Sequence, residues 1–342
     1  REVLPSSEPH ENREADRHVK DKEEQQGDTS AEPRATKTPK PKKMPKSKPG
    51  TRRSSKRKKG AAPGPYPEAL VTLMMSGWRE PSPREVQPIA AAEAHRARRQ
   101  ALSERFEGEA LVIPTGHEVV RANDTHYAFR PGSDFFYLTG NTEPDCVLVL
   151  EPRKKGGHRH VLFVEPNPGR SDSTFFTDRH KGELWVGPRL GIEESRERFA
   201  VDECRPLAEL DAFLKARPKK KTRAVRGLSA RVDAHFKPGR ARDGELASAL
   251  SELRLIKEPG EIAELERAVA HTLVAFEDVI VALRDGRTER DVEVAFDARA
   301  RRCGNGTGYG TIAAAGKNAC ILHYTKNDEP LVQGELLLLD AG

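Results

Sequence analysis

A long apolar stripe between Glu261 and Leu283 defines the first element of the fold. Its large apolar residues recur every three or four positions: Ile262, Leu265, Val269, Leu273, Phe276, Ile280 and Leu283. This spacing places them on one face of a helix of about six turns. Pro259 suits its first turn and Gly286 its end. Thr288, followed by Asp291, is close to a capping box, so we expect another helix to about Cys303.

Strand-like and helical segments alternate earlier, over residues 85–240. A helical pattern covers Val86–Phe106, and others lie near Asp178–Trp185 and Leu207–Ala216. The runs expected to form strands are β-branched or aromatic: Ala110–Ile113, Phe135–Leu138, Cys146–Leu150 and His160–Val164. The alternation predicts an α/β domain whose sheet is covered by helices.

Residues 241–342 have a different order. The two long helices come first and are followed by three apolar runs, at residues 308–316, 319–324 and 335–342. We expect these runs to form strands, which gives an α+β arrangement distinct from that of residues 85–240. The chain begins with Arg1 and its last three residues follow directly on an apolar run, so we expect a fragment at both ends.

Residues 1–62 contain almost no large apolar side chains and are predicted to be disordered, because they cannot bury enough surface to offset the entropy of ordering. Residues 33–60 carry 13 Lys or Arg and no acidic residue, and the remainder of the chain has 46 basic against 53 acidic residues. The basic run could be a solvated extension, a localisation signal or a phosphate-binding arm. The folded part is mildly acidic, so we do not expect it to bind nucleic acid.

The four cysteines lack CxxC spacing, which argues against a disulfide framework. No apolar run approaches the ~18 residues that span a bilayer, and we expect a cytoplasmic protein without a membrane anchor.

Two residues near the end of the chain could carry chemistry. Asp340 follows the apolar run Leu336–Leu339 and precedes small residues, which suits an oxygen ligand for a hard divalent cation. The alternative is an acidic residue that ends a strand and caps a turn. His323 lies within an apolar run and could stabilise an oxyanion or move a proton, although a core histidine bonded to a backbone carbonyl is the more frequent case. His158 and His160 lack an acidic or Cys companion, so a metal site there is not expected.

The chain also resembles aminopeptidase P, the Xaa-Pro aminopeptidases of the pita-bread metallopeptidases, over about residues 85–342. The similar segments are FRPGSDFFYLTGNTEP (Phe129–Pro144), ELWVGPRLG (Glu183–Gly191), LRLIKEPGEIAELERA (Leu253–Ala268), ILHY (Ile321–Tyr324) and LLLLDAG (Leu336–Gly342). They occur in the expected order, and the first two separate this family from methionine aminopeptidases. The resemblance implies an N-terminal α/β domain at 85–240 and part of a pita-bread domain at 241–342, which follow the segment 1–62 that its composition predicts to be disordered.

For the site, the resemblance implies two divalent metal ions, usually Mn²⁺, held by two Asp, one His and two Glu. Only the first Asp has a counterpart, Asp340. His323 matches the histidine that contacts the substrate carbonyl beside the scissile bond, and Tyr309 matches a tyrosine near the metals. Trp185 matches a tryptophan that reaches a neighbouring subunit's active site in tetrameric members, which implies a homodimer or homotetramer. The loop at residues 313–319 has alanines where the family is glycine-rich, which affects the shape of the pocket.

The expected function is removal of the N-terminal residue from peptides with proline in second position, with this chain inactive because four ligands are missing. Two alternatives stay open: a prolidase or creatinase-like hydrolase, and a non-catalytic pita-bread module that binds a protein or nucleic acid.

Overall fold

The computed structural model describes residues 66–79 and 84–342, so the basic segment within residues 1–62 lies outside the described residues. The first helices are α1 (Glu68–Met74) and α2 (Ala92–Arg105). After them, a five-stranded sheet is formed by β1 (Ala110–Pro114), β4 (Val147–Pro152), β5 (His158–Val164), β6 (Glu203–Pro206) and β7 (Thr222–Ala224). A separate small hairpin joins β2 (Val120–Ala122) to β3 (Thr125–His126).

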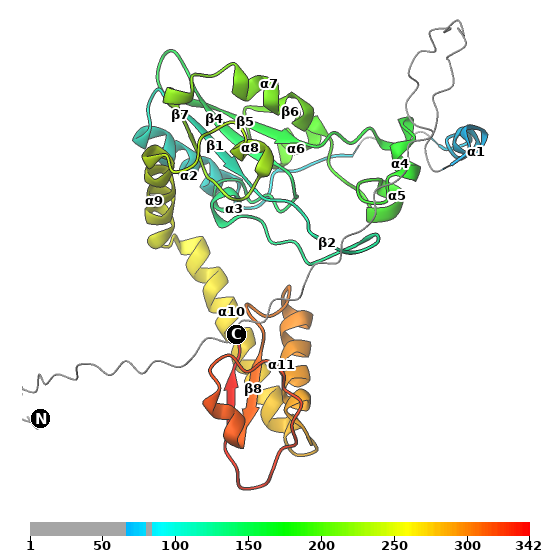
Figure 1. Ribbon diagram of the computed structural model, residues 1–342, viewed down its shortest axis with the longest axis vertical. Coiled ribbons are helices and arrows are strands. Elements are labelled where there is room, and N and C mark those ends of the chain that lie inside the picture. Colours follow the sequence, from blue (N-terminus) through cyan, green and yellow to red (C-terminus); the bar gives the residue numbers. More distant parts are fainter. Residues whose placement is uncertain (1–65, 80–83) are drawn as a thin grey trace, which may run out of the picture. The chain divides into compact units, whose positions relative to one another are not determined.

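The strand order in the large sheet is β6-β5-β4-β1-β7 (Figure 1). The central pairs β1–β4 and β4–β5 are antiparallel, whereas the edge strands β7 and β6 run parallel to their neighbours. Around the sheet lie α3 (Ser133–Thr139), η1 (Gly169–Ser171), α4 (Thr174–Thr177), α5 (Glu183–Val186), α6 (Ile192–Arg198), η2 (Leu207–Glu209), α7 (Leu210–Lys215), η3 (Lys219–Lys221), α8 (Ala230–Asp233) and α9 (Ala241–Leu255).

Both faces of the sheet are covered, which makes a three-layer α/β arrangement. Alternate residues of each central strand point to opposite faces, so Leu148 and Leu150 of β4 enter one core and Val147 and Val149 the other. The first core is completed by residues of α2, α3 and α9, and the second by residues of α7 and α8. The near-continuous apolar character of β1, β4 and β5 follows from this double burial.

One expected strand is wrong, because Phe135–Leu138 lies within helix α3. Phe135, Tyr137 and Leu138 are buried while Phe136 is exposed, a pattern that fits a short helix lying with one side on the sheet. Gly140 ends the helix in the left-handed conformation at φ 66°, which favours glycine. The segment Asp178–Trp185 is also not one helix, since α4 and α5 flank a turn there.

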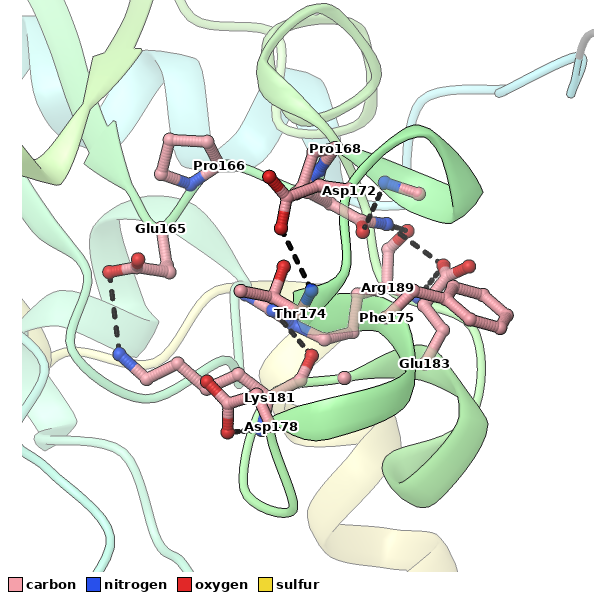
Figure 2. Close-up of a pocket in the computed structure, with 13 residues that line it drawn as sticks. Glu165, Pro166, Pro168, Asp172, Thr174, Phe175, Asp178, Lys181, Glu183 and Arg189 are labelled. Atoms are coloured by element: carbon pink, nitrogen blue, oxygen red, sulfur yellow. Dashed lines mark hydrogen bonds and ion pairs between the residues drawn. The ribbon is translucent and has the colours of Figure 1, made fainter. Parts of the chain in front are cut away.

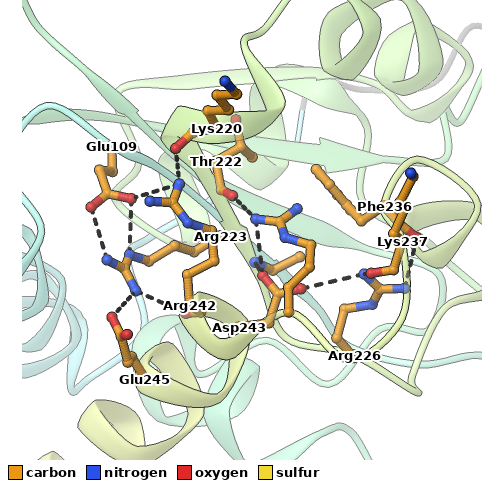
Figure 3. A network of polar contacts seen from close by, with 12 residues as sticks. Glu109, Lys220, Thr222, Arg223, Arg226, Phe236, Lys237, Arg242, Asp243 and Glu245 are labelled. Carbon is orange, nitrogen blue, oxygen red and sulfur yellow. Dashed lines mark hydrogen bonds and ion pairs between the residues drawn. The ribbon is translucent and has the colours of Figure 1, made fainter.

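A polar network ties the edge strand β7 to the start of α9 (Figure 3). Asp243 is 5% exposed and accepts a hydrogen bond from the Ala224 backbone N–H at 3.0 Å, with the Arg226 guanidinium at 3.4 Å. Arg223 bonds Glu109 at 3.0 and 2.9 Å and Glu245 at 2.6 Å. These charged hydrogen bonds fix the first turn of α9 against the sheet.

The buried guanidinium of Arg99 links α2 to three other segments. It is fully buried and donates to the carbonyls of Leu138 at 2.7 Å and Ala200 at 2.8 Å, and to Nδ1 of His160 at 3.2 Å. His160 must therefore be neutral with its proton on Nε2. Burial, together with the nearby Arg99 charge, lowers the pKa of His160 to about 4.

The rest of the chain forms α10 (Pro259–Ala282), α11 (Glu289–Cys303), β8 (Ile312–Ala315), η4 (Gly316–Cys320) and β9 (Leu337–Asp340). The expected capping box is present, since Asp291 accepts from the Thr288 backbone N–H at 2.9 Å. β8 and β9 pair as an antiparallel two-stranded sheet against α10 and α11. The strand expected at residues 319–324 is wrong, because η4 and a turn occupy that stretch.

The apolar stripe of α10 is largely exposed to solvent. Leu273 is 61% and Ile280 66% exposed, whereas the residues of this helix that are buried are Ala275 and Val279. The helix packs on α11 through this narrower neighbouring face, with Phe276 at its border. Among the described helices, none combines the length and the apolarity needed to cross a membrane.

The first prediction concerns His160. Because its pKa falls from 6.5 unfolded to about 4 folded, the unfolded state binds the proton first as pH decreases. The free energy of unfolding should lose about 3 kcal/mol from this residue between pH 7 and pH 4. His160→Gln keeps an acceptor for Arg99 and removes the titration. Urea unfolding of both proteins across this range should show a smaller loss in the variant, and parallel curves would contradict the assignment.

Candidate active site

Asp340 is the last residue of β9 and lies at one end of the two-stranded sheet that β8 and β9 form. It pairs in register with Ile312 of β8, and its Oδ1 accepts a hydrogen bond from the Tyr309 hydroxyl. This bond to Asp340 raises the pKa of Tyr309. The backbone closes the same corner, since Gly308 N–H donates to the Gly342 carbonyl at 2.7 Å. Tyr309 and Asp340 therefore form one hydrogen-bonded unit.

The apolar run that leads to Asp340 is covered on one face and exposed on the other. Leu336 is 84% and Leu338 42% exposed, and Asp340 is itself exposed. Only Leu337, Leu339 and Ala341 pack toward α10 and α11, because β9 has one neighbouring strand and one covered face. The carboxylate therefore faces outward on the side of the sheet that bears Leu338.

His323 lies in an exposed turn after η4 rather than in an apolar core. Within residues 84–342, no hydrogen bond joins it to Asp340 or Tyr309. Its backbone position is nevertheless fixed by its neighbour, because Tyr324 is buried and its N–H donates to the Ile321 carbonyl at 3.3 Å. The turn thus exposes the imidazole of His323 to solvent, while Tyr324 fixes the backbone beside it.

A buried carboxylate, Glu289 in the first turn of α11, holds Tyr324 and therefore supports this turn. It is fully buried and accepts hydrogen bonds from the Ala315 N–H at 2.7 Å, the Tyr324 hydroxyl at 2.6 Å and the Glu329 N–H at 3.0 Å. The Asn318 amide adds a fourth at 3.0 Å.

These bonds set the protonation of both partners. Burial alone would raise the pKa of Glu289, but the hydrogen bonds outweigh it and hold this pKa below its usual range. In turn, the bond to Glu289 raises the pKa of Tyr324 to about 12. Glu289 is not predicted from the sequence, because an acidic residue at the start of a helix is common and no local signal marks it as buried.

On the outer edge of β8, side chains rather than a third strand form hydrogen bonds with the backbone N–H and C=O groups. Asn327 accepts from Ala313 N–H at 3.1 Å and donates to the Thr311 carbonyl at 2.8 Å, while Glu289 receives Ala315 N–H. This occupancy explains why residues 319–324 do not pair as a strand. It also holds the loop of His323 beside β8.

Trp185 lies in α5, on the α/β part of the chain. It is 44% exposed, and its indole N–H donates to the Phe176 carbonyl at 2.8 Å. The helix begins with Glu183, which lines a pocket of about 260 Å³ between Glu165, Asp172, Lys181 and Arg189 (Figure 2). Burial would raise the pKa of Glu183, but hydrogen bonds from Arg189 N–H, Asn167 and Arg84 lower it overall.

The described residues do not by themselves fit a pair of metal ions. Over residues 66–79 and 84–342, no three His, Cys, Asp or Glu side chains gather into a group that could hold a cation. The part of the chain that the structure describes therefore holds no complete metal centre.

Two family models match the chain in sequence. The aminopeptidase P N-terminal domain matches residues 95–225, and metallopeptidase family M24 matches residues 263–342. The chain belongs to the aminopeptidase P family. The α/β part is thus an aminopeptidase P N-terminal domain, and the region holding Asp340 belongs to an M24 catalytic domain.

Curated relatives agree with this assignment. Xaa-Pro aminopeptidase 1 of Streptomyces coelicolor is 43% identical over 290 residues, which are 84% of this chain and 58% of the relative. The Xaa-Pro aminopeptidase of Escherichia coli is 34% identical over 271 residues, 72% of this chain and 57% of the relative. The chain spans less than two thirds of the length of these relatives.

Solved structures show the same fold. The low-pH form of E. coli aminopeptidase P aligns with a TM-score of 0.61 at 30% identity, covering 76% of this chain and 60% of that one. Proline aminopeptidase P II from Yersinia pestis gives 0.60 at 30% identity, covering 73% and 59%. A further E. coli structure is zinc-substituted and in complex with product.

The second prediction tests Glu289. Glu289→Ala leaves four donors without their acceptor, so it should lower the free energy of unfolding by roughly 3 kcal/mol or more. Glu277→Ala on the exposed side of α10 is the matched control and should change it by less than about 0.5 kcal/mol. Urea unfolding with hydrogen exchange of the β8 amides provides the measurement. Equal effects of the two substitutions would rule out the central role of Glu289.

Proposed function

We propose that the whole protein removes the N-terminal residue from peptides with proline in second position. The observation that carries the proposal is the Tyr309–Asp340 unit, placed at the end of β9 within the M24 region and preceded by an aminopeptidase P N-terminal domain. The relatives named Xaa-Pro aminopeptidase support the same activity. The proposed division is an N-terminal domain at 85–240 and a catalytic part at 241–342, although α9 at the start of the second part packs on the sheet of the first.

In this proposal Asp340 is one ligand of a pair of divalent cations, with manganese as the proposed metal. The M24 family supports a divalent metal cofactor, and the missing ligands must come from outside the described residues. Tyr309 holds Asp340 through its hydroxyl, which fixes the carboxylate orientation and leaves its second oxygen available. That positioning role follows from the chain's own contacts.

The proposed substrate roles fall on exposed side chains that can reach a bound peptide. His323 would donate to the substrate carbonyl oxygen beside the scissile bond, since an imidazole N–H is a suitable oxyanion donor. The residue in second position has no backbone N–H when it is proline, so a site that does not need this donor accepts it. Trp185 would contact substrate at a neighbouring subunit, which requires a homodimer or homotetramer. We place the protein in the cytoplasm.

Two other functions remain as alternatives. A prolidase or creatinase-like hydrolase shares the family plan and would act on dipeptides or small amidines. A non-catalytic module would bind a partner without turnover, which is compatible with the single metal donor in the described residues. The similarity of the α/β part to the aminopeptidase P N-terminal domain favours the aminopeptidase.

The third prediction is that a polypeptide of residues 1–342 alone releases no amino acid from Xaa-Pro peptides, even with excess Mn²⁺, because one ligand cannot hold two cations. The test is amino-acid release from Xaa-Pro-Xaa tripeptides measured by liquid chromatography. Turnover by this polypeptide would refute the ligand assignment.

The fourth prediction places Asp340 in the metal site. Joining residues 1–342 to the remaining catalytic part of the S. coelicolor relative should restore activity and bound metal. In this chimera Asp340→Asn should lower kcat/KM at least about a hundredfold, since even the loss of a residue that only orients a metal ligand costs about 10–100-fold. Asp285→Asn, an exposed carboxylate after α10, is the control and should leave it unchanged.

Substrate length separates the alternatives in the same chimera. An aminopeptidase cleaves Xaa-Pro-Xaa peptides at least as well as Xaa-Pro dipeptides, whereas a prolidase cleaves only the dipeptides. Metal bound at full occupancy without turnover of either substrate would favour the non-catalytic module.

A further inference from the structure

Two histidines that are far apart in sequence meet at the surface of the α/β part. His126 is the last residue of β3 in the β2–β3 hairpin, and His180 lies in the turn between α4 and α5. Nε2 of His126 and Nδ1 of His180 are 3.2 Å apart, and the ring centroids are 5.0 Å apart with the planes at 77°. His180 is exposed and His126 half-buried, so solvent reaches the pair.

We propose that His126 and His180 together bind a divalent transition-metal ion such as Zn²⁺, Ni²⁺ or Cu²⁺. Tetrahedral zinc binds imidazole nitrogen at about 2.0–2.1 Å, which sets two such nitrogens about 3.3–3.4 Å apart. The observed separation of 3.2 Å is within the tolerance expected of a ligand pair before metal enters. Imidazole nitrogen is a ligand that these borderline cations accept readily.

Hydrogen bonds fix the backbone next to both histidines. The Asp178 carboxylate, part of the pocket wall in Figure 2, accepts from the N–H groups of His180 at 2.9 Å and Lys181 at 3.0 Å. On the hairpin side, Tyr127 N–H donates to the Val119 carbonyl at 3.0 Å. The two backbones are therefore in place before a metal enters, which limits the ordering entropy that opposes binding.

The site has two protein donors, and water fills the other coordination positions. In the described ranges no third His, Cys, Asp or Glu joins the pair, so binding is weaker than at a structural zinc site. It lies in the aminopeptidase P N-terminal domain, on elements separate from the β9 strand that carries Asp340. A hydrogen bond between two exposed imidazoles is worth only about 0.5–1.5 kcal/mol, and water competes for it. If the two histidines only share a hydrogen bond, the pair has no metal affinity, whereas a metal site binds the cation measurably.

Trp185 offers an optical signal for the site. Arg179, the residue before His180, has its guanidinium 5.4 Å from the Trp185 ring centroid. The chain has one other tryptophan, Trp78, which Arg170 covers at 4.8 Å. Cu²⁺ at His180 should quench Trp185 fluorescence, and Trp185→Phe should remove most of that signal while leaving the affinity unchanged.

The test titrates the 342-residue chain, freed of metal by chelator and dialysis, with NiCl₂ and ZnCl₂ by calorimetry and with CuCl₂ by fluorescence. We expect one saturable event that His126→Gln and His180→Gln each weaken at least about tenfold, because even residues that only orient a ligand contribute about 10–100-fold. Gln retains hydrogen bonding but is a poor ligand. His271→Ala, at an exposed histidine of α10, is the matched control and should leave the event unchanged.

The histidines of the N-terminal segment, His10 and His18, are present in every variant, so they cannot produce the difference. Unchanged circular dichroism in the Gln variants excludes misfolding as the cause of lost binding. Unaltered affinity in both Gln variants, or no saturable binding by the parent chain, overturns the proposal.

Discussion

A carboxylate buried without a cation partner organises the region around the candidate active site. Glu289 is fully buried, yet no Lys or Arg of the described residues pairs with it. Its charge is instead divided among two backbone N–H groups, one amide and one phenol, and lies at the positive end of α11. A buried charge is tolerated only when such donors replace water. The position of α11, β8, η4 and the loop before residue 330 therefore depends on one side chain.

The small residues of β8 follow from the same arrangement. Ala313 and Ala315 carry only methyl side chains, which leave room for Asn327 and Glu289 to reach their N–H groups. Asn327 adopts a positive φ of 47°, a conformation that Asn tolerates better than most residues. The Ala-rich segment that departs from the glycine-rich family pattern is thus compatible with a closely packed strand edge. The turn of His323 and the corner of Asp340 are supported on the two sides of this strand.

Local patterns in the sequence were sufficient for elements stabilised by local contacts. The capping box at Thr288 and Asp291 and the helix with Pro259 in its first turn are formed by neighbours in sequence, and both were predicted. The doubly buried strands β1, β4 and β5 were also predicted, because their composition reflects burial. Phe135–Leu138 failed because a short apolar run fits a buried helix as well as a strand.

The failures at the candidate site have a different cause. Whether Leu336–Leu339 is buried depends on which elements cover the second face of its sheet, and no period in the sequence reports this. The buried state of Glu289 depends on four donors spread over residues 315–329, so it is a tertiary property. The roles proposed for Asp340, Tyr309 and His323 come from the resemblance to a family, and the structure shows a hydrogen bond between the first two. It did not join His323 to them.

The solvent-facing stripe of α10 has a consequence for the behaviour of this polypeptide in solution. Isolated apolar side chains are normal on a protein surface, but a contiguous row that runs along a helix of 24 residues is not. Salts such as sulfate, which are excluded from protein surfaces, strengthen the drive to bury such a row. The chain should therefore precipitate at lower ammonium sulfate concentration than its net charge suggests, and mild chaotropes should keep it dispersed.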